Sequence, residues 1–170
     1  MVESFSGLFN VRPMDSADWP IVSDIYRQGL QTGLATFEEV VPHWQDWDRN
    51  HLKTCRIVGE MEGNLVGWAA LTPVSARKIY AGVAEVSVYV GLPFWRKGAG
   101  EALLQELILQ SEHQGIWTLQ SGIFPDNLGS IALHEKLGFR KVGFREKIGQ
   151  SKGAWRDTIL MERRSRVVNF

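Results

Sequence analysis

Residues 83–100 read VAEVSVYVGLPFWRKGAG, and they contain the strongest strand signal in the chain. Its first eight residues predict a strand in which Val86, Val88 and Val90 share one face and Glu85 lies on the other. A glycine-containing loop follows, then a long helix and another strand. A strand, a helix and a second strand in this order predict a right-handed parallel crossover, which is typical of an α/β protein.

The rest of the chain predicts further elements of the same kind. Apolar residues at helical spacing predict one helix from Asp15 to Gly33 and a second that begins at Pro42 and includes Leu52. Strands are predicted at 9–12, 56–61, 65–72, 117–123, 139–147 and 155–162, and helices at 100–114 and 127–137. The order β-α-α-β-β-β-α-β-α-β-β predicts a sheet layered with helices, in a single domain over residues 1–170.

The composition restricts the classes of function. Nineteen Lys and Arg residues balance nineteen Asp and Glu residues, whereas a general nucleic-acid binder usually carries a basic excess. The first twenty residues hold no apolar run of signal-peptide length, and no stretch approaches the roughly 18 apolar residues of a membrane span. One cysteine, Cys55, excludes an internal disulfide and a multi-cysteine zinc site. We therefore expect a soluble cytoplasmic protein with no metal, nucleic-acid or membrane partner.

The loop at residues 95–100 is a candidate anion site. Its glycines let backbone N–H groups turn inward, and the helix behind it adds unpaired N–H groups and a positive dipole end. Arg96 and Lys97 add positive charge. Leu103 replaces the third glycine of a dinucleotide fingerprint, and no Gly-Lys-Ser/Thr follows, so the loop predicts a phosphate-bearing cofactor other than NAD or ATP. The alternative is a glycine-rich turn with two solvated basic residues.

Two further positions are candidates for chemistry. Asn127, Ser130 and His134 share one face of a predicted helix, so His134 is either a catalytic group or a structural histidine. Glu85 lies in a strand among small and apolar neighbours. Such a carboxylate is found at a sheet edge, in a pair, or in a cleft where it acts as a general base.

Four segments in register resemble the GNAT superfamily of N-acetyltransferases, and most closely its phosphinothricin (methionine sulfoximine) N-acetyltransferase branch. They are residues 34–38 (LATFE), 84–90 with the glycine loop at 98–100, 127–139, and 153–157 (GAWRD). The resemblance implies the GNAT fold, a mixed central β-sheet with splayed parallel strands and helices on both faces. It also implies acetyl-CoA as cofactor, a small amino-acid-like amine as substrate, and a homodimer.

The resemblance assigns roles to individual residues. Glu85 would be the general base for the substrate ammonium, and His134 would protonate or hydrogen-bond the departing thiolate or assist base catalysis. The acetyl group would pass directly to the amine without an enzyme nucleophile. The implied cofactor contacts are Val88, Tyr89, Val90, Arg96, Lys97, Gly98, Ala99, Gly100, Glu101, Asn127 and Ser130. The candidate substrate contacts are Phe37, Arg77, Lys78 and Trp155.

The chain departs from the family pattern at two places. Trp95 stands where the superfamily loop usually carries Gln or Arg, and Ser75 and Ala81 stand where branch members carry arginines. The first departure leaves open a non-catalytic acyl-CoA-binding module. The second leaves open which amine is acetylated, including the amines of intact proteins or ribosomal subunits.

Overall fold

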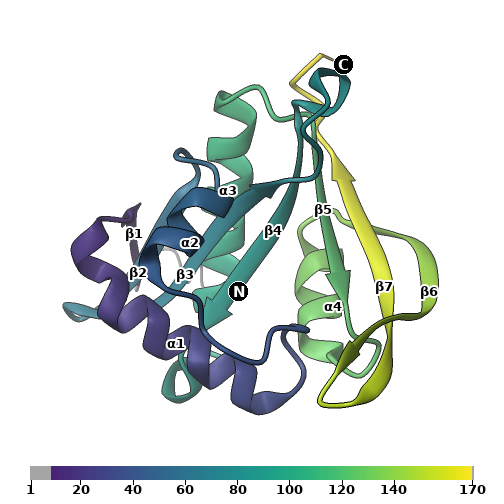
Figure 1. The fold of residues 1–170 in the computed structure, drawn as a ribbon. Helices are drawn as coiled ribbons and strands as arrows, with labels where there is room; N and C mark the ends of the chain where they lie inside the picture. The colour runs from purple at the N-terminus through teal and green to yellow at the C-terminus, as the bar shows by residue number, and fades with distance from the viewer. Residues whose placement is uncertain (1–8, 170) are drawn as a thin grey trace, which may run out of the picture.

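The structure, a computed structural model, describes residues 9–169. Its strands are β1 (Asn10–Pro13), β2 (Arg56–Met61), β3 (Asn64–Pro73), β4 (Val83–Val90), β5 (Thr118–Ile123), β6 (Arg140–Ser151) and β7 (Ala154–Arg164). Its helices are α1 (Trp19–Thr32), α2 (Trp44–Asn50), α3 (Ala99–His113) and α4 (Leu128–Lys136), with 3-10 turns η2 (Ser16–Asp18), η3 (Lys78–Tyr80) and η4 (Leu92–Phe94). The strands form one sheet in the order β1-β2-β3-β4-β5-β7-β6 (Figure 1).

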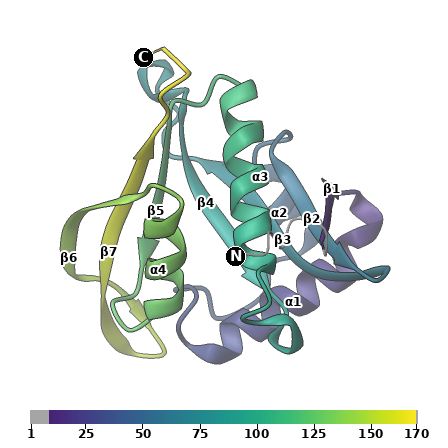
Figure 2. The same ribbon diagram turned by 180° about the vertical axis from the view of Figure 1, so that it is seen from behind.

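Helices cover both faces of this sheet. The helices α1 and α2 lie on one face, and α3 and α4 lie on the other, as the two opposite views show (Figures 1 and 2). The core under α3 is aliphatic and includes Leu103, Leu104 and Leu107, whereas the core under α1 and α2 is aromatic and includes Trp47 and Trp68. The predicted layered architecture is therefore confirmed. Within residues 9–169, no helix is long and apolar enough to span a membrane.

The ends of the first two helices follow local side chains. Asp15 accepts a hydrogen bond from the Ala17 N–H at 2.8 Å and begins η2, which continues into α1. Gly33, with φ of 69°, ends α1 as predicted. The second helix was predicted to begin at Pro42 and to include Leu52, which is wrong, because α2 covers only Trp44–Asn50.

A buried arginine explains the early end of α2. Arg56 donates to the Asp48 carbonyl at 2.7 Å and to the His51 carbonyl at 2.9 Å. These carbonyls would otherwise lack partners at the helix C-terminus. Arg56 is the first residue of β2, six residues beyond the end of α2. Its role as a C-terminal cap therefore depends on how β2 returns past α2.

The last two strands are longer than the sequence predicts. The structure extends the predicted strand 139–147 to Ser151 and the predicted strand 155–162 to Arg164. Register shifts in β6 between Lys141 and Gly143 and between Arg145 and Gly149 break the alternation of side chains. Without alternation the sequence pattern shows only part of the hairpin.

The neighbours of β4 distinguish its two sides. On one side, β4 pairs with β3 at every position from Ala84 to Val90. On the other, it pairs with the parallel strand β5 only from Val83 to Glu85. Figure 1 shows β4 and β5 diverging toward their C-terminal ends. The predicted splay of two parallel strands is therefore confirmed, and it positions the candidate site.

Candidate active site

The gap beside β4 exposes backbone groups that have no strand to pair with. Gly91 donates its backbone N–H to a β3 carbonyl at 2.9 Å, so its polar groups point toward β3. Neighbouring residues of an antiparallel pair alternate in direction, so Val86, Val88 and Val90 point theirs away from β3. The β4–β5 ladder ends at the rung of Glu85 and Gln120, which uses the Val86 N–H, so the Val86 carbonyl and the polar groups of Val88 and Val90 face the gap. A chain that contains amides can pair with them as an added strand does.

Tyr89 differs from its two valine neighbours. Its backbone points toward β3, and its ring stacks on Trp68 at 4.7 Å and meets Tyr26 edge-on at 4.9 Å. Burial raises the pKa of the Tyr89 phenol, and it raises the pKa of Tyr26 to about 12. The structure thus places Tyr89 in the aromatic core on the α1 side, while Val88 and Val90 contribute backbone groups to the gap.

The loop after β4 has the geometry of an anion site. Arg96 has a φ of 60° and Gly98 a φ of 89°, and Gly98 immediately precedes α3. The first N–H groups of α3, those of Ala99, Gly100 and Glu101, have no partner within the helix because no earlier turn exists. The partial positive charge at this end of the helix favours phosphate.

Side chains around this helix end leave the anion site positive. Arg96 and Lys97 are exposed, and the Lys97 ammonium lies 5.6 Å from the centre of the Phe94 ring. The Glu101 carboxylate is paired with Lys136 of α4 at 2.6 Å, so its negative charge is compensated. The predicted cofactor contacts from Arg96 to Glu101 therefore come together at the C-terminal end of β4.

Glu85 lies at the last rung where β4 and β5 pair. Its side chain is exposed, and the Gln120 side-chain amide donates to its carboxylate at 3.1 Å. Because β4 lies between β3 and β5, the alternative that placed Glu85 at a sheet edge is wrong. Sequence reasoning missed Gln120, since only the parallel register of β4 and β5 brings the two residues together.

His134 is buried and held in one tautomer. Its Nδ1 lies 2.8 Å from the Ser130 carbonyl oxygen, which can only accept, so Nδ1 carries the hydrogen. Its Nε2 then has a free lone pair in the neutral ring, and this atom is buried without a hydrogen-bond partner among the described residues. Burial lowers the pKa of His134, so the ring is neutral at pH 7. The ring also meets Phe139 edge-on at 4.8 Å.

Asn127 and Ser130 share local hydrogen bonds with this histidine. The Asn127 side-chain oxygen accepts from the Ser130 backbone N–H at 3.2 Å and so caps α4. The Asn127 side-chain nitrogen donates to the Leu34 carbonyl at 3.1 Å, which joins α4 to the loop after α1. The three residues of the predicted polar face are therefore linked, with Asn127 in a capping role and Ser130 beside His134.

The four candidate substrate contacts lie at opposite ends of β4 and β5. Phe37 meets Phe124 edge-on at 4.9 Å, at the C-terminal end of β5, and Trp155 is exposed nearby on the β6–β7 hairpin. Arg77 and Lys78 are exposed at the start of η3, which precedes the N-terminal end of β4. The two ends are separated by about 20 Å, roughly the length of a six-residue strand. Only Arg77 and Lys78 lie at the same end of the sheet as Glu85.

A second arginine organises the loop at residues 33–39. The Arg156 guanidinium lies 4.2 Å from the centre of the Phe124 ring, and it binds both carboxylate oxygens of Asp126 at 3.0 and 3.1 Å. It also donates to the Gly33 carbonyl at 3.4 Å. Arg156 therefore joins β7, the end of β5 and the loop after α1. The sequence places Arg156 in a family segment but offers no signal for this role.

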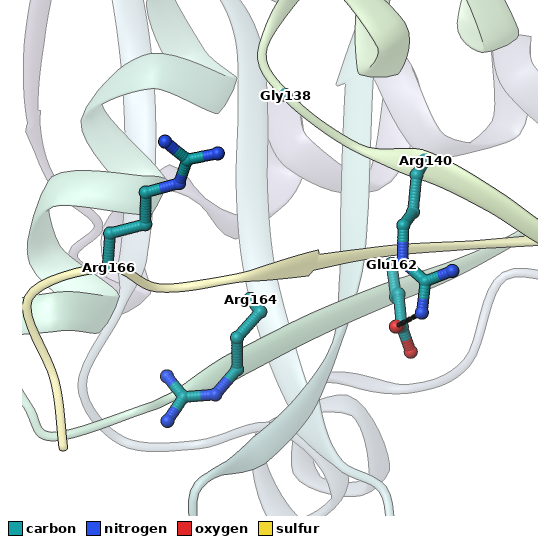
Figure 3. Close-up of a pocket in the computed structure, with 5 residues that line it drawn as sticks. All are labelled: Gly138, Arg140, Glu162, Arg164 and Arg166. Carbon is teal, nitrogen blue, oxygen red and sulfur yellow. Dashed lines mark hydrogen bonds and ion pairs between the residues drawn. The ribbon is translucent and has the colours of Figure 1, made fainter. Parts of the chain in front are cut away.

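A surface hollow of about 360 Å³ lies away from the gap, beside the C-terminal end of β7. Figure 3 shows Arg140 paired with Glu162, at 2.5 Å, and the side chains of Arg164 and Arg166 extending to opposite sides of the strand end. Arg164 donates to four backbone carbonyls. The positive groups of this hollow do not converge, and it contains none of the candidate catalytic residues.

Comparison with known proteins agrees with this geometry. Residues 19–139 match the acetyltransferase (GNAT) family. A phosphinothricin N-acetyltransferase of Alcaligenes faecalis is 33% identical over 160 residues, which cover 90% of this chain and 81% of that protein. An L-methionine sulfoximine/L-methionine sulfone acetyltransferase of Pseudomonas aeruginosa is 28% identical over 159 residues, which cover 90% of this chain and 92% of that protein.

Solved structures are similar over nearly the whole chain. A ribosomal-protein-alanine N-acetyltransferase of Brucella melitensis superposes with a TM-score of 0.85 at 31% identity, covering 92% of this chain and 99% of that one. A phosphinothricin acetyltransferase of Sinorhizobium meliloti in complex with acetyl-CoA superposes with a TM-score of 0.83 at 30% identity, covering 92% of this chain and 88% of that one.

Proposed function

The chain belongs to the acetyltransferase (GNAT) family, and we propose that it transfers an acetyl group from acetyl-CoA to the primary amine of a small amino-acid-like acceptor of the phosphinothricin and methionine sulfoximine type. One observation carries the proposal. The unpaired backbone groups of β4 lead directly to the phosphate-binding end of α3, so a single molecule with amides and a diphosphate is matched along its length.

The residues present fit acetyl-CoA. The gap-facing backbone of Val86 and Val88 would hold the amides of its pantetheine arm. The N–H groups of Ala99, Gly100 and Glu101, with Arg96 and Lys97 beside them, would hold its diphosphate. When bound, acetyl-CoA supplies an activated acetyl group on a thioester.

Glu85 is the group we assign to the acceptor's proton. An amine is mostly protonated at neutral pH and must lose a proton before it can attack a carbonyl carbon. Glu85 lies at the start of the gap, and its exposed carboxylate is held by Gln120 through one oxygen. The other oxygen is left to accept the proton, directly or through a water molecule.

His134 is suited to accept a hydrogen bond rather than to donate one. The neutral ring has its hydrogen on Nδ1, where the Ser130 carbonyl takes it, so Nε2 has only a lone pair to offer. Of the roles considered from the sequence, this tautomer favours assistance to base catalysis. Protonation of the departing thiolate by His134 would first require the buried ring to become charged, which burial opposes.

The acceptor would be oriented by charge at the Glu85 end of the gap. Arg77 and Lys78 precede β4 and are exposed there, so they are our candidates for the acceptor's carboxylate. Phe37 and Trp155 lie at the opposite end, and a small amino acid cannot touch both sets. We therefore assign the contact with the acceptor's carboxylate to Arg77 and Lys78. Phe37 and Trp155 would contact a larger part of a ligand that extends to their end of the strands.

Similarity to a ribosomal-protein-alanine N-acetyltransferase favours a second candidate, acetylation of a protein N-terminus. Isothermal titration with acetyl-CoA, followed by a thiol-release assay, separates the two. The acceptors would be phosphinothricin, methionine sulfoximine, a panel of free amino acids, and peptides with an N-terminal alanine. We expect binding of acetyl-CoA and turnover of free amino acids. Turnover of peptides alone would support the second candidate, and no binding at millimolar acetyl-CoA would refute both.

We also propose that the chain forms a homodimer through the β6–β7 hairpin. The edge strand β6 is exposed along most of its twelve residues, and Phe144, Ile148 and Trp155 expose large apolar side chains there. A long exposed edge with apolar side chains is usually covered in the functional protein. Light scattering after gel filtration should give a dimer mass, and Phe144→Asp should shift it to the monomer. A monomeric wild-type protein would contradict this proposal.

The cytoplasmic location stays a prediction. The thiol of Cys55 is buried, and burial raises its pKa, which keeps it protonated and unreactive at neutral pH. A free thiol supports a reducing compartment. The balanced charge supports a small-molecule partner rather than nucleic acid.

A further inference from the structure

Trp95 makes an internal hydrogen bond at the position where the family pattern has a polar side chain. Its indole Nε1 donates to the Val90 carbonyl oxygen at 2.8 Å. Its backbone N–H donates to the Leu92 carbonyl, and 49% of the residue's surface remains exposed. The side chain therefore reaches back to the last residue of β4 from the loop at residues 91–98, which we call the phosphate loop.

The acceptor of this bond is a gap-facing group. Val90 points its carbonyl away from β3, as the alternation along β4 requires. Among the gap-facing carbonyls of Val86, Val88 and Val90, this one alone is bonded to a side chain of the described residues. Trp95 thus satisfies the unpaired group nearest the phosphate loop and leaves the other two to a ligand.

The loop between β4 and α3 needs such anchors. Arg96 has a left-handed backbone, which costs a residue with a side chain about 1–2 kcal/mol. The first half of the loop is fixed by the Gly91 N–H bond to β3 and by the Leu92 N–H bond to the Gln28 side chain at 2.9 Å. The Trp95 indole is the corresponding anchor immediately before Arg96, on the side that leads to α3.

We propose that Trp95 is a positioning residue for the cofactor, whose indole bond to Val90 holds the phosphate loop in the conformation that presents the N–H groups of α3. The choice of acetyl-CoA as the ligand rests on the proposed function, whereas the hydrogen bond from Trp95 to Val90 does not depend on it. A loop already held in the binding conformation need not be ordered on binding, and the apparent affinity is the intrinsic affinity multiplied by the fraction of molecules in which the site is formed.

Trp95→Phe tests the proposal, because it keeps an aromatic ring and removes only the donor. Loss of one neutral hydrogen bond should weaken CoA binding about fivefold in isothermal titration. Turnover at saturating acetyl-CoA should stay within twofold of wild type, so that KM rises while kcat does not. Without any ligand, hydrogen exchange of the backbone at residues 91–98 should be faster than in wild type, with an unchanged melting temperature. Trp95→His keeps a ring N–H and should recover part of the affinity.

Leu92→Ala is the matched control, since it trims an exposed side chain of the same loop that makes no hydrogen bond. It should leave CoA affinity within twofold of wild type. If Trp95→Phe binds CoA as wild type does and exchanges at the same rate, the positioning role is refuted. If wild-type protein does not bind CoA, the proposed function fails, and the exchange measurement alone still decides whether Trp95 holds the loop.

Discussion

The two sides of β4 differ in how their backbone groups are satisfied. Toward β3, seven consecutive residues are paired, and Gly67 lets the two strands approach closely under Leu103. Toward β5, pairing stops at Glu85, and the backbone beyond it faces a gap. Backbone groups that have no partner strand need water or a ligand for their hydrogen bonds, so only the β5 side of β4 has groups that a ligand can pair with.

The two sides of β4 therefore have different roles: the side paired with β3 supports the strand, and the side open toward β5 can bind a ligand. The paired side holds β4 in place, because any shift of the strand would break hydrogen bonds to β3 as well as packing. The open side then presents its groups at defined positions, which is what a ligand that pairs like a strand requires. Changes on the paired side should therefore affect stability, and changes on the open side should affect binding or turnover.

The largest effect should come from the open side, at Glu85. Glu85→Gln keeps the shape and removes the proton acceptor, so kcat/KM for the amine should fall by about 10²–10⁴-fold, the usual contribution of a general base. Affinity for acetyl-CoA in isothermal titration should stay as in wild type. Glu106→Gln, on α3, is the control and should keep full activity. Residual activity above a tenth of wild type would show that the proton leaves by another route.

On the paired side, Gly67→Ala should reduce stability. A Cβ at this position would lie 2.7 Å from the Tyr89 carbonyl oxygen and 2.8 Å from the Leu103 side chain, and backbone cannot move aside. We expect the free energy of unfolding in urea to fall by about 2–3 kcal/mol. Gly122→Ala in β5 adds the same atom in open space and should change it by less than about 0.5 kcal/mol. Equal losses in both variants would contradict the distinction between the two sides.

The aromatic layer that covers the paired strands should make stability depend on pH. His51 stacks on Trp47 at 4.0 Å, and burial lowers its pKa to about 4, whereas the unfolded chain titrates near 6.5. Between these values the unfolded state binds the extra proton, so stability is complete above pH 6.5 and is lost as pH falls toward 4, by up to about 1.4 kcal/mol per pH unit. Burial lowers the pKa of His134 as well, and it acts in the same direction.

Urea unfolding at pH 7, 5.5 and 4.5 measures this loss, which should reach about 2 kcal/mol at pH 4.5. His51→Gln removes the titrating ring, and its stability should fall less steeply over the same range. An identical slope in the variant would assign the pH dependence to other groups.

The smallest effect should come from Gln120, which donates a hydrogen bond to Glu85 at the last paired position of β4 and β5. Gln120→Met removes the donor to Glu85 and keeps the length of the side chain. Because the exposed carboxylate can turn to water instead, kcat/KM should fall only about threefold. Acetyl-CoA affinity should be unchanged. A loss as large as that of Glu85→Gln would mean that Gln120 itself contacts the acceptor.

Regular periodicity explains which parts of the fold were predictable. β4 and α3 repeat apolar residues at a single period, and their predicted bounds agree with the structure within a residue or two. The bulged strand β6 has no constant period, so the prediction leaves out its last four residues, 148–151. The end of α2 was misplaced because Arg56, which caps it, belongs to the next strand.

The candidate site divides in the same way. Glu85, His134 and the loop from Arg96 to Gly100 were predicted because family segments and helix-end chemistry are local. Gln120, Arg156 and the bond from Trp95 to Val90 were not, since each depends on a contact between separate segments or on the direction of one carbonyl. The sequence grouped Arg77 and Lys78 with Phe37 as substrate contacts, but the structure places them at opposite ends of β5.

Local period and motif in the amino-acid sequence predict the order of strands and helices along the chain, the family, and the residue types available for an acetyl transfer. Contacts between separate segments set which side of β4 is left unpaired, that His134 is buried, and which oxygen of Glu85 is free. These properties depend on neighbours that are distant in the chain, and no local pattern in the sequence records them.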